Sequence, residues 1–167
     1  MTDTLESLAE RVVKTFTERG ATLSTSESLT GGLVGATITS VPGASRIYLG
    51  GAIAYDLLMK SQLSGVAKGI LDTYGVVSEQ TVTEMAVGIQ ALTRSDWAIA
   101  VSGVAGPTPQ EGHEPGEVWI CIAGPRIGSQ HHFLQSRKYH FEGDRVAVRS
   151  QTVTTALTML LTMVSPV

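Results

Sequence analysis

Residues 21–40 read ATLSTSESLTGGLVGATITS, and the fold is predicted outward from this stretch. A short run with β-branched residues, 21–25, favours a strand. The polar turn 26–30 follows, and the apolar residues after Gly31-Gly32 predict a helix over the second half of the stretch. A strand that turns directly into a helix is typical of an α/β fold.

Periodicity and turn residues divide the rest of the chain into further elements. We expect strands at about 47–55, 97–101, 117–123 and 131–141, and helices from Leu5 to Gly20, over 56–63, after Ser78 and after Asp144. The stretch around Gly65 and Gly69 is interpreted as irregular. Because 97–101 is almost entirely apolar, we predict a sheet that is covered on both faces. The order of the elements, with two adjacent strands at 117–123 and 131–141, predicts that the sheet is mixed. No repeat or linker interrupts the pattern, so residues 1–167 are expected to form a single domain.

Composition excludes several classes of partner. The chain is 43% hydrophobic and 16% charged, with a formal net charge of -3 and no run of Lys or Arg. Neither nucleic acid nor an anionic membrane is therefore an expected partner. No apolar stretch reaches the roughly 18 residues of a membrane span, and the N-terminus lacks the pattern of a secretory leader. We expect a cytoplasmic protein.

Cysteine and histidine give no support for a metal site. Cys121 is the chain's single cysteine and is expected to be a buried strand thiol in a reducing compartment. His131 and His132 are expected on opposite faces of a strand, and His132 and His140 share a face but would lie about 26 Å apart. We therefore expect neither a metal nor another cofactor.

Ser28 is a candidate nucleophile because of its place between a strand and a helix. Free N–H groups at a helix start can bind an anion or stabilise an oxyanion. The alternative is that Ser26, Ser28 or Thr30 merely caps the helix, since hydroxyl caps are common. The pattern is neither a Walker A loop nor a Gly-x-Ser-x-Gly elbow.

Tyr55 and Lys60 follow the next expected strand, and both could face the same edge of the sheet. A lysine that burial keeps neutral can deprotonate a serine. The alternative is that Asp56 and Lys60 form an ordinary exposed i,i+4 ion pair and that Tyr55 is a wall residue. Spacing alone favours this second interpretation.

Arg145 and Arg149 lie one turn apart after the expected cap Asp144. Cations are mildly unfavourable at a helix start, and a bound anion such as a phosphate would relieve that cost. Pairing with Asp144 or Glu142 is an equally good interpretation.

Two glycine-containing stretches are weaker candidates for binding. The Gly50-Gly51 pair inside an expected strand suggests that another group packs close to the backbone. Ser102-Gly103 follows a buried strand, which is a common place for ligand sites in α/β proteins and equally the place of a plain turn.

Six motifs in order resemble the CinA C-terminal domain family over about Leu5 to Val164. They are Ser26 to Gly32, Val41 to Ser45, Gly51 to Tyr55, Gly75 to Glu79, Ser102 to Pro107 and Gly143 to Arg145. The resemblance implies a three-layer α/β/α sandwich with a mixed sheet that forms a homo-oligomer.

The resemblance also implies an activity in pyridine nucleotide salvage. Active members hydrolyse nicotinamide mononucleotide to nicotinic acid mononucleotide and ammonia without a metal. By matching positions, Ser28 would be the nucleophile, Lys60 its general base and Tyr55 the residue that orients or relays the proton. Backbone N–H groups near Thr30, Gly31 and Gly32 and near Ser102 and Gly103 would hold the oxyanion and the ribose-phosphate, with Gly50 a further binding residue. Arg145 would contact the phosphate or the carbonyl.

This chain departs from the family pattern where activity is concerned. Leu29 replaces the usual Cys, and Leu57, Leu58 and Met59 replace a polar segment, which is expected to change the wall of the pocket. The loop 108–113 replaces an acidic, glycine-rich loop. Two hypotheses follow: an amidohydrolase acting on a pyridine nucleotide, or a paralogue that keeps the fold and a nucleotide pocket, without turnover or with a different substrate, as a binding or assembly module.

Overall fold

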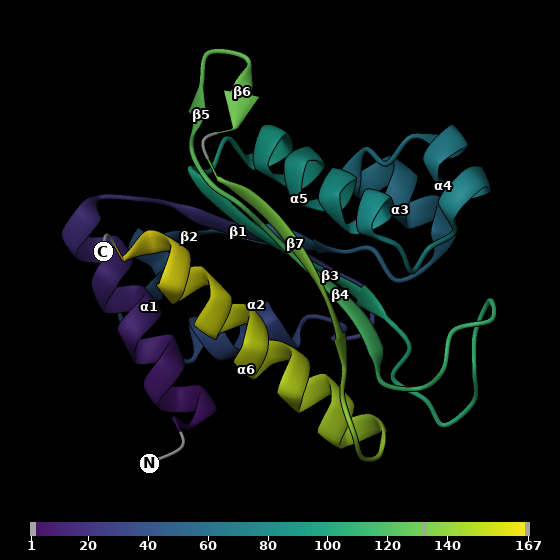
Figure 1. Ribbon diagram of the computed structural model, residues 1–167. Helices are drawn as coiled ribbons and strands as arrows, with labels where there is room; N and C mark the ends of the chain where they lie inside the picture. Colours follow the sequence, from purple (N-terminus) through teal and green to yellow (C-terminus); the bar gives the residue numbers. More distant parts are fainter. Residues whose placement is uncertain (1–2, 132, 166–167) are drawn as a thin grey trace.

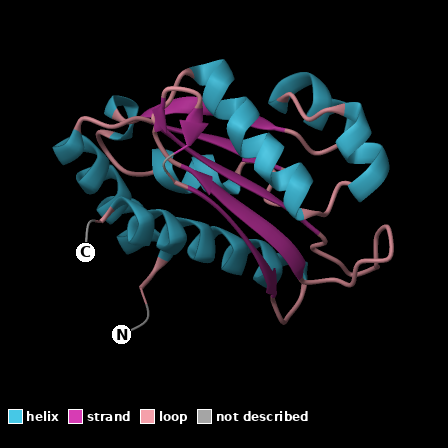
Figure 2. Cartoon of the chain, turned by 45° about the horizontal axis from the view of Figure 1, so that its top comes forward, coloured by secondary structure: helices cyan, strands magenta, loops and turns pink. Residues whose placement is uncertain are grey.

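A computed structural model describes residues 3–131 and 133–165, which form a mixed sheet between two layers of helices (Figures 1 and 2). The main sheet has the order β2-β1-β3-β4-β7. Its strands are β1 (Leu23–Glu27), β2 (Tyr48–Ile53), β3 (Trp97–Gly103), β4 (Glu117–Ala123) and β7 (Leu134–His140). β1 pairs in parallel with β2 and β3, whereas β3–β4 and β4–β7 are antiparallel. The predicted mixed sheet is confirmed.

Helices cover both faces of this sheet. α1 (Leu5–Arg19), α2 (Leu33–Thr39) and α6 (Arg145–Val164) lie on one face, and α3 (Leu57–Ser64), α4 (Lys68–Tyr74) and α5 (Glu79–Thr93) lie on the other (Figure 1). A one-turn 3-10 helix, η1 (Ala44–Arg46), precedes β2. The three-layer α/β/α architecture is confirmed.

Strand β3 shows why the sheet needs two covered faces. Its residues Ile99 and Val101 join the hydrophobic cluster formed with α1, α2 and α6, whereas Ala98 and Ala100 join the cluster formed with α5. Side chains alternate between the faces of a strand, so an uninterrupted apolar run buries surface on both sides.

Two parts of the expected element pattern were wrong. The stretch interpreted as irregular around Gly69 contains the helix α4, which is too short to show a clear helical periodicity. The expected strand 131–141 begins only at Leu134, because β5 (Arg126–Ile127) and β6 (Gln130–His131) form a separate small hairpin. The expected placement of His132 lies outside the described residues.

Parallel pairing places the start of three loops at one edge of the sheet. β1, β2 and β3 run in the same direction, so the residues after Glu27, Ile53 and Gly103 meet at their carboxyl ends. This edge is where open α/β sheets hold their ligands.

In the described part of the chain, no helix combines the length and the apolar character needed to cross a membrane.

Candidate active site

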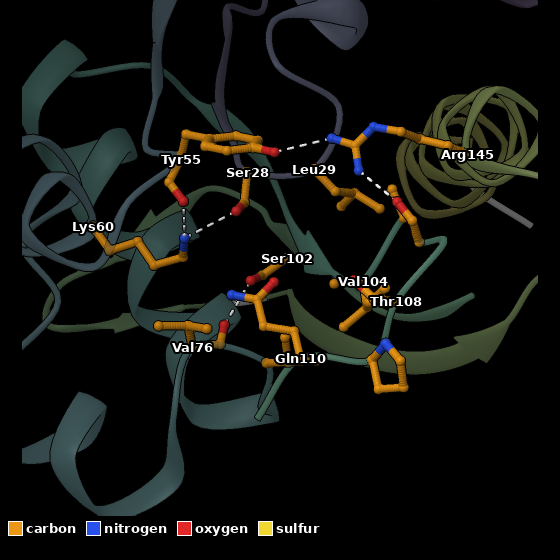
Figure 3. Close-up of a pocket in the computed structure, with 15 residues that line it drawn as sticks. Ser28, Leu29, Tyr55, Lys60, Val76, Ser102, Val104, Thr108, Gln110 and Arg145 are labelled. Atoms are coloured by element: carbon orange, nitrogen blue, oxygen red, sulfur yellow. Dashed lines mark hydrogen bonds between the residues drawn. The ribbon is translucent and has the colours of Figure 1, made fainter. Parts of the chain in front are cut away.

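A pocket of about 300 Å³ opens at this edge of the sheet (Figure 3). It is enclosed by the turn after β1, the segment between β2 and α3, the segment before α5, the loop after β3 and the start of α6. The lining residues are Ser28, Leu29, Tyr55, Lys60, Val76, Val77, Ser102, Gly103, Val104, Ala105, Gly106, Thr108, Pro109, Gln110 and Arg145. Six of the ten sequence-predicted site residues therefore share one cavity: Ser28, Tyr55, Lys60, Ser102, Gly103 and Arg145.

Ser28 is presented by a tight turn at the end of β1. Its N–H donates to Val101 O on the neighbouring strand at 3.0 Å, and its carbonyl accepts from Gly31 N at 3.0 Å. These two bonds fix the main chain on either side of the residue. The Ser28 side chain is left to face the pocket (Figure 3).

Glu27, rather than a hydroxyl group, caps the helix α2. Its Oε1 accepts from Val34 N at 2.8 Å and from Thr30 Oγ1 at 2.7 Å, and its Oε2 accepts from Gly35 N at 3.0 Å. A carboxylate at a helix start satisfies free N–H groups and complements the helix dipole. The alternative in which Ser26, Ser28 or Thr30 caps the helix is therefore wrong, because their hydroxyl groups bond to Ser64, Lys60 and Glu27 instead. Sequence reasoning missed Glu27, whose only signal was an acidic side chain just ahead of a helix.

Lys60 is buried against Ser28. Only 1% of the residue is exposed, and its Nζ donates to Ser28 Oγ at 2.9 Å and to Tyr55 O at 3.1 Å (Figure 3). It also donates to Ala54 O at 2.9 Å. Asp56 instead caps α3 by accepting from Leu58 N and Met59 N. The exposed Asp56–Lys60 pair favoured by spacing alone is therefore wrong.

Burial changes the acidity of the Lys60 amine. Loss of water around the charged form lowers the pKa of Lys60 to about 8, although the negative charges of Asp56 and Glu111 partly oppose this shift. A neutral amine has two N–H donors and one lone pair. With the two main-chain carbonyls accepting its protons, the lone pair of neutral Lys60 would be directed at the hydroxyl of Ser28.

Tyr55 and Arg145 form the opposite wall of the pocket. Arg145 donates from Nη2 to Tyr55 Oη at 3.0 Å and from Nη1 to Gly106 O at 2.8 Å (Figure 3). Among the ion pairs of residues 3–131 and 133–165, none joins Arg145 to Asp144 or Glu142. The hydroxyl of Tyr55 thus contacts Arg145, while its main-chain carbonyl contacts Lys60.

The sequence model of the CinA C-terminal domain matches residues 5–164. This chain belongs to that family. It is 43% identical over 122 residues to a CinA-like protein of Pseudothermotoga lettingae, a match that covers 72% of this chain and 30% of that protein. A CinA-like protein of Thermotoga neapolitana is 38% identical over 153 residues, 91% of this chain and 36% of that protein. The chain spans about a third of the length of the curated relatives it matches.

Solved structures of CinA-superfamily proteins share the fold. The competence or damage-inducible protein from Enterobacter asburiae superimposes with a TM-score of 0.92 at 30% identity, covering 98% of this chain and 100% of that one. The competence/damage inducible protein CihA from Agrobacterium tumefaciens gives a TM-score of 0.90 at 31% identity, covering 99% and 100%. The fold assignment is confirmed over nearly the whole chain.

Four sequence-predicted binding residues of this CinA domain lie outside the pocket lining: Thr30, Gly31, Gly32 and Gly50. Thr30 is buried and donates its hydroxyl to Glu27, and Gly31 donates its N–H to Ser28. At Gly50 an added Cβ would meet open space, whereas at Gly51 it would meet Thr25 and Tyr48. The close backbone approach expected in β2 is therefore at Gly51, and it serves packing within the sheet.

The departures from the CinA pattern divide into two groups. Leu57 and Leu58 are about half exposed, and neither they nor Met59 line the pocket, so the expected change of the pocket wall at 57–59 is wrong. Leu29 and the loop residues 108–110 do line it. The pocket is thus altered on the side of the loop after β3.

Within the described residues, no group of three or more His, Cys, Asp or Glu side chains is arranged to hold a metal ion. Cys121 is fully buried in β4, and burial raises the pKa of its thiol to about 11. The expectation of a buried strand thiol is confirmed. Sequence reasoning missed Val76 and Val77 as lining residues, because they reach the pocket only through the packing of the segment before α5.

Proposed function

We propose that this CinA-family chain hydrolyses the carboxamide of a pyridine nucleotide, converting nicotinamide mononucleotide to nicotinic acid mononucleotide and ammonia. One observation carries the proposal: a buried lysine amine with a pKa of about 8 lies 2.9 Å from the hydroxyl of Ser28. A serine activated by an adjacent base is the arrangement that nucleophilic acyl transfer requires. The resemblance to active family members supplies the substrate class.

The first half of the reaction uses the pair directly. Ser28 Oγ attacks the amide carbon, and its proton passes to the neutral Nζ of Lys60. The carbon–nitrogen bond then breaks, Lys60 returns the proton to the leaving nitrogen, and ammonia departs. An ester between Ser28 and the nicotinoyl group remains.

In the second half of the reaction, water hydrolyses the ester, and Lys60 again accepts and returns a proton. A water molecule attacks the ester carbon and gives a proton to Lys60, and Ser28 Oγ takes that proton as it leaves. The products are the carboxylic acid and free serine. These steps require no metal or cofactor.

The remaining lining groups account for binding. Gly31 N already donates to Ser28 O, so the N–H of Leu29, a lining residue next to the nucleophile, is the donor we assign to the oxyanion. Arg145 brings a positive charge to the pocket wall and is the group we assign to the substrate phosphate. Tyr55 then orients Arg145 instead of relaying a proton.

The test is ammonia release from nicotinamide mononucleotide by the purified protein. We expect Ser28→Ala to abolish release, while Ser40→Ala retains it, because Ser40 is exposed at the end of α2 and does not line this pocket. Release that survives Ser28→Ala would identify a contaminating amidase or another nucleophile.

The binding-module hypothesis has lost one of its grounds. Leu57, Leu58 and Met59 motivated it, and they lie outside the pocket; the altered loop 108–110 still favours a change of substrate. Calorimetry with nicotinamide mononucleotide separates the two. Tight binding without ammonia release supports a binding module, and turnover eliminates it.

A further inference from the structure

Arg149 holds the turn that presents Ser28. Its Nε donates to Leu29 O at 3.0 Å and its Nη2 donates to Thr30 O at 3.0 Å. These carbonyls belong to the two residues that directly follow Ser28, and they lie 120 and 119 positions away from Arg149 in the sequence. The planar guanidinium thus engages two successive carbonyls, which a lysine cannot do with the same geometry.

The position of Arg149 is not explained by the helix that carries it. Residues near the amino-terminal end of α6 experience the positive end of the helix dipole, which disfavours a cation. Within residues 3–131 and 133–165, no ion pair joins Arg149 to a carboxylate. The positive charge of Arg149 is therefore stabilised by its hydrogen bonds to the carbonyl oxygens of Leu29 and Thr30.

Arg145 and Arg149, the two arginines of α6, contact different groups. Arg145 lines the pocket and reaches Tyr55 and Gly106, whereas Arg149 is absent from the pocket lining and reaches the back of the Ser28 turn. An anion bound in the pocket would therefore contact Arg145 and not Arg149. The sequence-based interpretation of Arg149 as an anion ligand has no support from this arrangement.

The turn is held from two sides. Glu27 accepts N–H groups of α2 at one side, and Arg149 donates to the carbonyls of Leu29 and Thr30 at the other. Between these contacts, Ser28 Oγ is 2.9 Å from Lys60 Nζ. A small displacement of the turn would lengthen this distance, on which proton transfer depends.

We propose that Arg149 is a positioning residue that keeps Ser28 in line with Lys60 by clamping the carbonyls of Leu29 and Thr30. The kinetic part of this proposal rests on the proposed amidohydrolase function. The structural part does not, because the clamp is a property of the turn itself.

The experiment compares Arg149→Met and Arg149→Lys with the wild type. Ammonia release gives kcat and KM, and amide hydrogen exchange reports the opening of residues 29–34. Arg11→Met is the matched control, because Arg11 forms an exposed ion pair with Asp3 far from this turn in the sequence. All four proteins are also assayed with low millimolar guanidinium ion.

We expect Arg149→Met to lower kcat by about 100-fold with KM changed less than about twofold, since misplacing a reacting group affects the chemical step. Exchange over 29–34 should accelerate in this variant, guanidinium should restore part of kcat, and Arg149→Lys should fall between it and wild type. Arg11→Met should match the wild type throughout.

A raised KM with unchanged kcat and unchanged exchange would overturn the proposal and make Arg149 a ligand of the substrate. Unchanged kcat, KM and exchange would overturn it as well. If Arg149→Met does not fold, Arg149→Lys alone decides between these outcomes. If the wild type releases no ammonia, the proposed function fails, while the exchange rates still decide whether Arg149 clamps the turn.

Discussion

At the scale of single residues, the molecule keeps one lysine amine out of water. Lys60 is among the largest fully buried side chains, and its hydrogen bonds to Ala54 O and Tyr55 O hold the amine beside Ser28. With a pKa of about 8, about a tenth of the amine is neutral at pH 7, against about one part in three thousand for an ordinary lysine at 10.5. In the proposed mechanism, burial therefore provides Lys60 with the neutral form that acts as the base.

The dependence of turnover on pH should report this amine. Because the proposed base is the neutral form of Lys60, kcat/KM for ammonia release is expected to rise with pH through an apparent pKa of about 8 and then level off. Lys60→Arg should be inactive at every pH, since a guanidinium does not lose its proton in this range. A flat profile between pH 6 and 9 would contradict the assignment of Lys60 as base.

At the scale of elements, close contact between two helices brings Lys60 into place. A Cβ added to Gly88 in α5 would clash with the main-chain oxygen of Ser64, the last residue of α3. Glycine at this point lets the two helices approach each other. The Ser26 and Ser64 hydroxyl groups, 2.6 Å apart, connect the same end of α3 to β1.

Replacing Gly88 by alanine should therefore displace α3 and its lysine. We expect Gly88→Ala to destabilise the protein by about 1–3 kcal/mol, as overpacking of an interior contact does, and to lower ammonia release. Gly69→Ala is the matched control. Gly69 lies in the helix α4 where an added Cβ meets nothing, so this variant should gain about 0.5–1 kcal/mol and keep its activity. Urea unfolding of both variants measures the difference.

At the scale of the whole molecule, the site is maintained at a cost in stability. Lys60 has a folded-state pKa of about 8, below the 10.5 of an exposed lysine, so its charged form is disfavoured by folding. Between pH 8 and 10.5 the unfolded chain binds more protons than the folded one, and stability rises with pH. Below pH 8 both states are protonated and the full penalty is present.

Replacing Lys60 by an apolar side chain should remove the free-energy cost of burying its charge. Lys60→Met is expected to raise the free energy of unfolding at pH 7 by up to roughly 3 kcal/mol, less the hydrogen bonds it loses, while abolishing turnover. The gain should shrink as pH rises from 8 towards 10.5. Chemical denaturation of both proteins at pH 7 and pH 10 measures it; a variant that is less stable than the wild type at pH 7 would show that the lost hydrogen bonds dominate.

Elements with a local cause were predicted from the sequence. The apolar run at β3 predicted a sheet covered on both faces, and Ser78 and Asp144 predicted the starts of α5 and α6, where each accepts an N–H from three residues on. A helix cap or the apolar face of a helix depends on residues within one or two turns of each other, so a short stretch of sequence is enough to predict it. The short helix α4 and the β5–β6 hairpin offered no comparable pattern.

The sequence by itself determined the covered sheet, the candidates Ser28, Lys60 and Arg145, and the order of the elements except α4 and the β5–β6 hairpin. Only the tertiary structure decided that Glu27 caps α2, that Lys60 is buried against Ser28 and that Arg149 reaches the turn carbonyls. The contacts of Lys60 and Arg149 join residues 32 and 120 positions apart. Local periodicity says nothing about such contacts, because the packing of whole helices on the sheet sets which distant groups meet and which of them lose their water.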